Sequence, residues 1–485
     1  MKKNILNTII LLSLCVCAVL LIYTHYKSYF VFENKRLSSY IIYYVIFSSG
    51  ILFFSILFFL KDTFKENILV SLTTFIFIAY ISECFFLFYK SKSLTDIQIN
   101  EKRRLEWGKI ILEKYNIEVD TRSKLEFQRD EKKKGNDLSV LITPYRMMQS
   151  EGIKNFSWKE GSDKPKRIFP LAGLSNKLTV GDAETGKYNV YLTDRYGFNN
   201  PDNEWDEKGH IVVIGDSTVH AIYLPWEDGW AGNIKKLTKK PTLALGIGNN
   251  GPLLELAILK EYAKKIKPEI IFWVYSEEND LLEVKEEIKS RTLSQYLNEN
   301  FTQNLSENQS LIDENYNFFL NSQIKEKENN NESVTNPFSI DDKKKYNLIS
   351  FIKLINLRQF LFNNTIEMIK GSVTKKDLSN FKKILLEAKD TTKSFNSKFF
   401  FVYVPASTRF IDSYEYKLKD DGFHRDEVLK IVKELEIPII DLWKLYFKDL
   451  DDPLSTLSFR LHSHYNKETI KNSSKILVEF LNKHN

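Results

Sequence analysis

Cysteine is scarce in this sequence: there are three in 485 residues, Cys15, Cys17 and Cys84, and all three lie in apolar N-terminal segments. The rest of the chain therefore has no disulfide framework and no thiolate metal site. A strong excess of one charge is also missing, because 69 lysines and arginines face 63 aspartates and glutamates, for a net charge of +6. That balance lacks the basic footprint of a nucleic-acid-binding protein. A hydrophobic content of 43% excludes global disorder.

Long uncharged apolar runs, by contrast, are concentrated at the N-terminus. Segments 5–23, 40–60 and 67–89 are each long enough to cross a hydrocarbon core of about 30 Å as a helix. We expect three transmembrane helices, since no small-x-small cleavage site follows the first run, as a signal peptide would require. Glu83 is the single acid in these runs and is either an intramembrane functional group or, more simply, a side chain that reaches the interface. The basic loop residues do not decide the orientation.

The composition changes along the chain predict four parts. Residues 1–90 hold the three membrane helices, and residues 91–140 form a charged helical connector. Residues 141–208 contain short extended pieces between glycines and prolines, which indicates a β-rich preface. Residues 209–485 are expected to form the main domain, with an insertion at about 290–395.

Short apolar runs alternate with helical patterns in this main domain. A continuous apolar run bounded by turn residues is typical of a strand that is buried on both faces. We expect five such strands, at residues 211–214, 242–245, 270–275, 399–404 and 438–441. Strands that alternate with helices predict an α/β fold, in which helices cover both faces of a parallel sheet.

Residues able to carry chemistry follow three of these predicted strands. Ser217, in Gly-Asp-Ser-Thr, follows the first strand, at the sheet edge where open α/β folds bind ligands and where a helix start favours an oxyanion. A glycine-rich turn with Gly248 and Asn249 follows the second strand, and Asn279 follows the third. Each of these can donate an N–H group to an oxyanion. For Ser217 and Asn279, a plain helix cap is the structural alternative.

A histidine near the C-terminus is the candidate base for this serine. His464 lies in Arg-Leu-His-Ser-His-Tyr-Asn, and histidine is the usual general base near neutral pH. Only the fold can bring His464 to Ser217, because the two are far apart in the sequence. His462 and His464 could instead bind a metal, but no acidic or thiol cluster with ligand spacing accompanies them. We therefore expect no metal and no cofactor.

These blocks, in this order and each after an expected strand, resemble those of the SGNH (GDSL-type) hydrolase superfamily. Residues 169–171 (Phe-Pro-Leu) and 194–201 (Asp-Arg-Tyr-Gly-Phe-Asn-Asn-Pro) also resemble the lead-in of membrane-anchored bacterial members, whose relatives include alginate O-acetylation proteins. The resemblance covers about residues 165–485 and implies a three-layer, flavodoxin-like SGNH fold behind the three transmembrane helices. It also implies a multi-pass protein of the bacterial inner membrane with its catalytic domain outside the cytoplasm.

Carried over by position, the resemblance assigns a role to each candidate residue. Ser217 corresponds to the nucleophile and His464 to the base. The oxyanion hole would comprise the Ser217 N–H, a backbone N–H at Gly248 or Asn249, and the Asn279 side chain.

The chain departs from the family pattern at three positions. Asn249 stands where the family has a glycine, and Glu278 replaces the glycine that precedes the block-three asparagine. The aspartate that the family places shortly before the histidine is missing. His464 must then be oriented by a backbone carbonyl or by another acid, for which Asp451 and Asp452 are the candidates. A Ser–His dyad remains viable, because the orienting acid tunes the attack rather than performing it.

Together these features predict a membrane-anchored serine acyl-ester hydrolase or O-acyltransferase that acts on a surface glycan or lipid-linked sugar through an acyl-serine intermediate. Water as the second acceptor would make it an esterase and a sugar hydroxyl a transferase, and the sequence leaves both open. The alternative is a non-catalytic glycan-binding or assembly-scaffold protein that retains the fold. The expected partners are the membrane, the acylated glycan or lipid-linked sugar and polysaccharide-assembly proteins, but not nucleic acid.

Overall fold

The computed structural model describes residues 2–31, 37–91, 96–150, 168–329, 351–352, 354–361, 373–410, 424–461 and 463–483. Part of the predicted insertion at about 290–395 therefore lies outside the described residues. The chain forms two compact units, which are described separately. One comprises Met1–Ser93 and Asp342–Lys375, and the other comprises Leu94–Asp341 and Lys376–Asn485.

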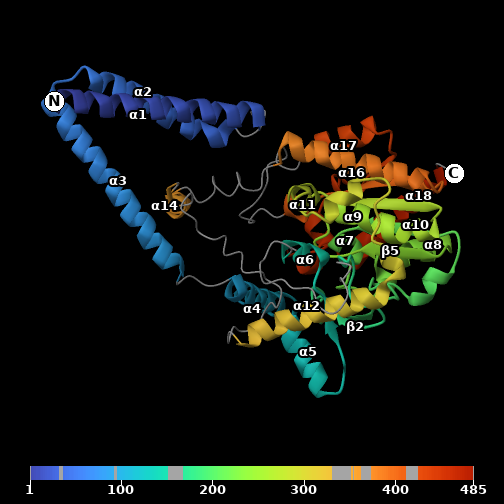
Figure 1. Ribbon diagram of the computed structural model, residues 1–485. Coiled ribbons are helices and arrows are strands. Elements are labelled where there is room, and N and C mark those ends of the chain that lie inside the picture. Colours follow the sequence, from blue (N-terminus) through green and yellow to red (C-terminus); the bar gives the residue numbers. More distant parts are fainter. Residues whose placement is uncertain are drawn as a thin grey trace, which may run out of the picture. The chain divides into compact units, whose positions relative to one another are not determined.

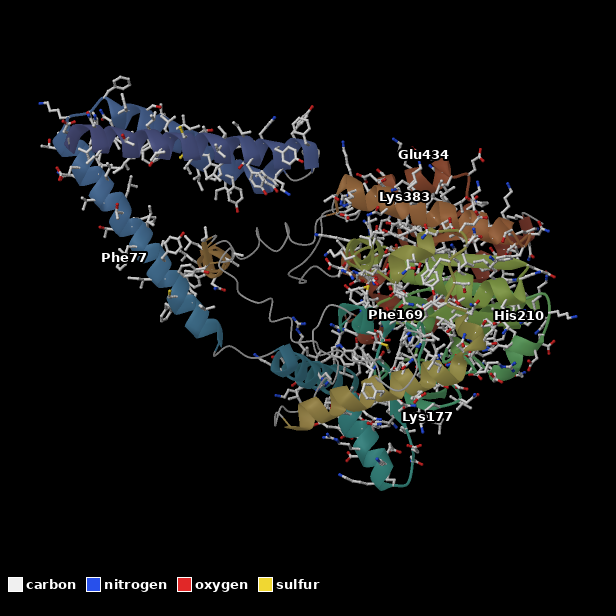
Figure 2. All side chains as sticks on the ribbon, viewed as in Figure 1. Phe77, Phe169, Lys177, His210, Lys383 and Glu434 are labelled. Atoms are coloured by element: carbon white, nitrogen blue, oxygen red, sulfur yellow. The ribbon has the colours of Figure 1, made fainter. Side chains whose placement is uncertain are left out.

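Three long apolar helices dominate the first unit. α1 (Lys2–His25) continues in a π-helical segment (Tyr26–Val31) and packs along α2 (Leu37–Phe58), and α3 (Asp62–Ser91) follows. Each helix contains a stretch that is long and apolar enough to cross a membrane, namely Asn4–Phe30, Tyr40–Phe58 and Asp62–Leu87. Many of their apolar side chains are exposed, as Phe77 on α3 is in Figure 2. The prediction of three apolar N-terminal helices is confirmed.

The second unit opens with helices and a small sheet. Its first elements are α4 (Asp96–Tyr115), α5 (Lys124–Lys133), β1 (Ser139–Val140), α6 (Pro144–Ser150), β2 (Leu178–Val180) and β3 (Val190–Leu192). A capping box starts α5, because Ser123 and Glu126 each bind the backbone N–H of the other. β2 pairs in parallel with β1 and antiparallel with β3. The chain between β2 and β3 forms an extended turn that becomes important at the candidate site.

A five-stranded parallel sheet forms the centre of this unit (Figure 1). Its strands are β4 (Ile211–Gly215), β5 (Thr242–Gly246), β6 (Ile270–Ser276), β7 (Lys398–Val404) and β8 (Ile439–Asp441). Their spatial order is β5-β4-β6-β7-β8, the 2-1-3-4-5 order of flavodoxin-like folds. The predicted strands and the α/β fold class are therefore confirmed.

Helices cover both faces of the sheet, which gives three layers. The main helices are α7 (Ser217–His220), α8 (Trp230–Thr238), α9 (Pro252–Ile258), α10 (Lys264–Ile266), α11 (Asp280–Glu287), α12 (Gln309–Asn329), α16 (Lys375–Lys393), α17 (Arg425–Glu434) and α18 (Lys467–Lys483). On one face, Ile234 of α8 and Leu477 of α18 join Val213 in a buried apolar cluster. On the other, the ring of Phe381 from α16 lies 5.5 Å from that of Tyr275. Burial on both faces explains why these strands are continuous apolar runs.

Candidate active site

Ser217 stands at the sharp turn between β4 and α7. Asp216 caps the helix, and its carboxylate accepts a hydrogen bond from the Thr218 N–H at 2.8 Å. Gly215 has to be a glycine, since a Cβ there would lie 2.6 Å from Cγ2 of Val219. Ser217 is the first residue of α7, so its backbone N–H has no partner within the helix. The turn therefore presents both a hydroxyl and a free N–H at the carboxyl end of the sheet.

Three side chains form a continuous chain of hydrogen bonds at this point. The distance between the Ser217 Oγ and His464 Nε2 is 2.8 Å, and His464 Nδ1 lies 2.7 Å from Oε1 of Glu184. The backbone N–H of His464 donates to the other oxygen of the same carboxylate at 2.9 Å. Because Glu184 accepts the Nδ1 proton, Nε2 is left to accept from the Ser217 hydroxyl. This is the arrangement of a nucleophile, a general base and an orienting acid.

The charge of Glu184 sets the protonation of His464. Burial by itself would lower the pKa of the imidazole, but the neighbouring Glu184 carboxylate and its hydrogen bond raise it. Asp182 and Asp216 act in the same direction, and the resulting pKa of His464 is about 9. His464 is therefore a stronger base than an ordinary histidine, and the neutral form in which Nε2 accepts from the Ser217 hydroxyl becomes the main form only as the pH reaches about 9.

An aromatic ring fixes the plane of the imidazole. Tyr223 stacks on His464 with ring centroids 5.2 Å apart and an angle of 14° between the planes. The Tyr223 hydroxyl donates to the carbonyl of Tyr465 at 2.6 Å, so the tyrosine is itself held in place. Glu184 and Tyr223 together restrict the ring to the orientation that faces Ser217.

The prediction that Asp451 or Asp452 orients His464 is wrong. Asp452 binds the guanidinium of Arg460, with Oδ1 and Nη2 2.8 Å apart, and Asp451 is exposed. The acid that bonds to His464 is Glu184, which lies in the turn between β2 and β3. Sequence reasoning missed it, because one acid in a glycine-flanked turn does not stand out among 63 aspartates and glutamates.

The sequence of this segment also allows a metal ion bound by His462 and His464. His462 lies outside the described residues, and His464 is engaged by Glu184 and Ser217. Within the described ranges, no three His, Cys, Asp or Glu side chains gather in a way that could hold a metal ion.

The turn after β5 lies beside the nucleophile, as expected, but its two N–H groups differ. A Cβ on Gly248 would lie 3.8 Å from the Cβ of Ser217. The Gly248 N–H already donates to Nδ1 of His220 at 3.2 Å, and burial lowers the pKa of His220 to about 3, so this ring is a neutral acceptor. Asn249 adopts a left-handed conformation with φ of 63°, which asparagine tolerates better than most residues. The turn thus accommodates a side chain where the family has glycine, and because the Gly248 N–H is already engaged, the Asn249 N–H is the remaining candidate donor.

Asn279 is held at the same cleft, at the start of α11. Its Oδ1 accepts from the Ser276 hydroxyl at 2.9 Å, and its side chain also makes hydrogen bonds to the carboxyl groups of Asp216 and Glu283, so its amide N–H groups would have to turn from these carboxyl groups to reach an oxyanion. Glu278, the other departure from the family pattern, also lines the cleft and accepts a hydrogen bond from Ser407 at 3.1 Å. The departure therefore places a carboxylate at the cleft wall.

The cleft over these residues has a volume of about 520 Å³ and an acidic lining. Five carboxyl groups face it, those of Asp182, Glu184, Asp216, Glu278 and Glu283. Among the described residues that line it, Lys124 is the one lysine or arginine, and it pairs with Asp182 at 2.5 Å. Burial raises the pKa of Glu283 well above its ordinary value and also raises the pKa of Asp216, so these two carboxyl groups add less negative charge to the lining than their number suggests.

Removal of the Asn279 amide tests the oxyanion hole. If Asn279 donates to the developing oxyanion, Asn279→Ala should lower kcat for ester turnover by about 10²- to 10³-fold, with little change in KM. Thr143→Val is the matched control, since Thr143 lines the same cleft but its hydroxyl has no partner among the described residues. Equal kcat values for Asn279→Ala and Thr143→Val would remove Asn279 from the oxyanion hole.

Comparison with known proteins finds distant structural similarity. No protein-family model and no curated protein matches this chain. Among solved structures, it is similar to a protein assigned to the lipolytic G-D-S-L family from Desulfitobacterium hafniense DCB-2, at 10% identity and a TM-score of 0.28, over 56% of this chain and 99% of that one. It is also similar to the psychrotrophic esterase EstA from Pseudoalteromonas sp., at 8% identity and a TM-score of 0.29, over 57% and 98%. Such scores are too low to carry a functional assignment, which depends instead on the site geometry.

Proposed function

We propose that this chain is a membrane-anchored serine acyl-ester hydrolase or O-acyltransferase of the SGNH type. The observation that carries the proposal is the hydrogen-bonded chain Ser217–His464–Glu184, with both contacts of His464 shorter than 3 Å. These three residues come from the β4–α7 turn, the C-terminal segment and the β2–β3 turn. They are far apart in the sequence, so no single turn or helix accounts for their contact. A hydroxyl, a base and an acid in this order are what acyl transfer requires.

The proposed reaction proceeds through an acyl-serine. Ser217 Oγ attacks the ester carbonyl carbon while His464 Nε2 takes the hydroxyl proton, and the carbonyl oxygen becomes an oxyanion. The N–H groups of Ser217 and Asn249 and the amide of Asn279 stabilise that charge. The tetrahedral intermediate then expels the alcohol, which receives its proton from His464. Water or a sugar hydroxyl, deprotonated by His464, releases the acyl group and restores Ser217.

The cleft and the apolar helices limit the substrate that we propose. Acidic side chains outnumber the one lysine in the described lining of the cleft, so we expect a short uncharged acyl ester to fit better than an ester on a strongly acidic polymer. Three apolar helices tie the chain to a membrane, which raises its local concentration near substrates held at that surface. An acylated surface glycan or a lipid-linked sugar meets both conditions. We place the protein in the bacterial inner membrane with the cleft outside the cytoplasm.

The competing proposal, a non-catalytic glycan-binding or assembly-scaffold protein, has less support. The absence of the family's aspartate before His464 favours it. However, Glu184 makes the hydrogen bond to His464 that such an aspartate would make. A binding module has no need for a base with its pKa raised to about 9 beside a serine hydroxyl.

The decisive experiment measures turnover of p-nitrophenyl acetate by the full chain in detergent micelles. We expect release of p-nitrophenol above the protein-free background and covalent labelling of Ser217 by a fluorophosphonate, located by mass spectrometry. Added sugar acceptors should accelerate release if the protein is a transferase and leave it unchanged if it is an esterase. A folded chain that neither turns over the ester nor takes up the fluorophosphonate would favour the binding or scaffold proposal.

A further inference from the structure

The insertion between β6 and β7 returns to the unit that holds the apolar helices. Helix α14 (Ile355–Leu361) belongs to this unit and packs against α3. Figure 1 shows α14 beside the C-terminal half of α3. That half belongs to the candidate span Asp62–Leu87, so α14 lies alongside a segment that is expected to be in the bilayer.

Glu83 of α3 holds the start of α14. Its carboxylate accepts from the backbone N–H groups of Asn356 and Leu357, at 3.0 and 2.7 Å, and from the Asn356 side chain at 3.0 Å. The Glu83 side chain is buried rather than extended toward an interface. A carboxylate from another helix thus satisfies the first N–H groups of α14, as a capping residue normally does. In water these N–H groups would find solvent, but in hydrocarbon they need a protein acceptor.

The turn before α14 also contacts α3, through a hydrogen bond and through aromatic rings. The Tyr80 hydroxyl donates to the carbonyl of Ile352 at 3.2 Å, so a carbonyl in this turn also has a partner on α3. The Tyr80 ring lies 5.2 Å from that of Phe351, and Phe86 stacks on Phe360 with centroids 4.4 Å apart. Among the described residues, the contact thus combines hydrogen bonds from Glu83 and Tyr80 with packing of aromatic rings.

Two apolar side chains of this segment are exposed, although one of them, Phe360, also stacks on Phe86 of α3. Ile352 is 58% exposed and Phe360 is 65% exposed. On α3 itself, Ile81 and Phe85 are exposed to a similar extent, 52% and 61%. Ile81 and Phe85 lie two residues before and after Glu83, on the face of α3 away from α14, so lipid around this part of the span can reach that face as well as the exposed side chains of Ile352 and Phe360.

We propose that the described residues 351–352 and 354–361 belong to a membrane-embedded element that does not span the bilayer, docked on α3 through Glu83 and exposed to lipid acyl chains through Ile352 and Phe360. The α/β unit then has two membrane attachments, one through the chain that precedes α4 and one through the insertion between β6 and β7. Glu83 is an anchoring residue for this element, and the proposal does not depend on ester chemistry.

Lipid contact can be measured with the full chain in nanodiscs of phosphatidylcholine and phosphatidylglycerol. Single cysteines at Ile352 and Phe360, in a chain with Cys15, Cys17 and Cys84 changed to serine, carry the fluorophore NBD. Phe77→Cys on α3 is the lipid-exposed reference, and Leu386→Cys on α16 is the water-exposed control, since both positions are exposed apolar residues. We expect blue-shifted emission at both sites and quenching by doxyl-labelled acyl chains close to that of the Phe77 reference.

A second set of variants tests the contact with Glu83. Glu83→Ala should reduce the doxyl quenching at Phe360, whereas Thr73→Val should not, because the Thr73 hydroxyl bonds only to Leu69 within α3. Should Glu83→Ala fail to fold, Asn356→Ala removes one of the same hydrogen bonds from the other side. Quenching at Ile352 and Phe360 no greater than at Leu386 would overturn the proposal. So would disulfide cross-linking of these sites between two copies of the chain without lipid quenching.

Discussion

Ser217→Ala should lower kcat/KM for ester turnover on the order of 10⁴-fold or more, to the level left by binding and the oxyanion donors alone. The hydroxyl of Ser217 is the group that lies 2.8 Å from His464 Nε2, so its removal takes away both the nucleophile and the proton that His464 accepts. His464→Ala should lower kcat/KM by a similar factor. The double variant, with both Ser217→Ala and His464→Ala, should have a kcat/KM only slightly lower than that of either single variant. Residues that act as one unit show this non-additivity. Steady-state kinetics with p-nitrophenyl acetate and the full chain give all three values.

Ser407→Ala is the control that separates chemistry from damage to the cleft. Ser407 lines the same cleft and bonds to Glu278, but it has no contact with His464. Its loss should change kcat/KM by no more than a few-fold, because the hydrogen bond that it removes does not involve Ser217, His464 or Glu184. Thermal unfolding of the Ser217→Ala chain should match the parent, because the side chain lies in an open cleft. Turnover that survives in Ser217→Ala would show that Ser217 is not the nucleophile.

Much of this site could be predicted because local patterns mark the carboxyl ends of parallel strands. Ser217 follows β4 and Asn279 follows β6, each directly after a continuous apolar run that ends in a turn. A strand buried on both faces has a distinct pattern, and open sheets bind ligands at this one edge. Once the strands were placed, the nucleophile and one candidate oxyanion donor followed from their positions in the sequence.

Glu184 could not be predicted in this way, because it does not belong to the parallel sheet. It lies in the turn between β2 and β3, two short strands of a separate small sheet. Nothing in the local pattern tells which surface such a turn will contact. The same limit applies to Glu83, whose apolar surroundings predict a helix but not the α14 segment that covers it. Contacts between separate elements are decided by packing and hydrogen-bond partners that a single sequence does not display.

Glu184→Gln should both slow the reaction and move its pH dependence. The amide cannot compensate a positive imidazolium and can hold His464 in the wrong tautomer, so kcat/KM should fall by up to about 10⁴-fold. In the parent protein the Glu184 charge raises the pKa of His464 to about 9, so the base is protonated at neutral pH and kcat/KM should rise with pH up to that value. Without that charge, burial lowers the pKa of the ring, and the rise should move to lower pH.

The matched control is Asp452→Asn, because the sequence alone makes Asp452 a candidate for the acid that orients His464. Asp452 binds Arg460 and does not contact His464, so its loss should leave the midpoint of the pH profile where it is in the parent. The pH dependence of kcat/KM for the three chains, corrected for the spontaneous hydrolysis of the ester, distinguishes the two acids. A profile that moves with Asp452→Asn, or that stays in place with Glu184→Gln, would mean that Glu184 does not set the charge of the base. A shift with Glu184→Gln alone requires the carboxylate to act on His464 itself, which a merely structural role in the β2–β3 turn would not produce.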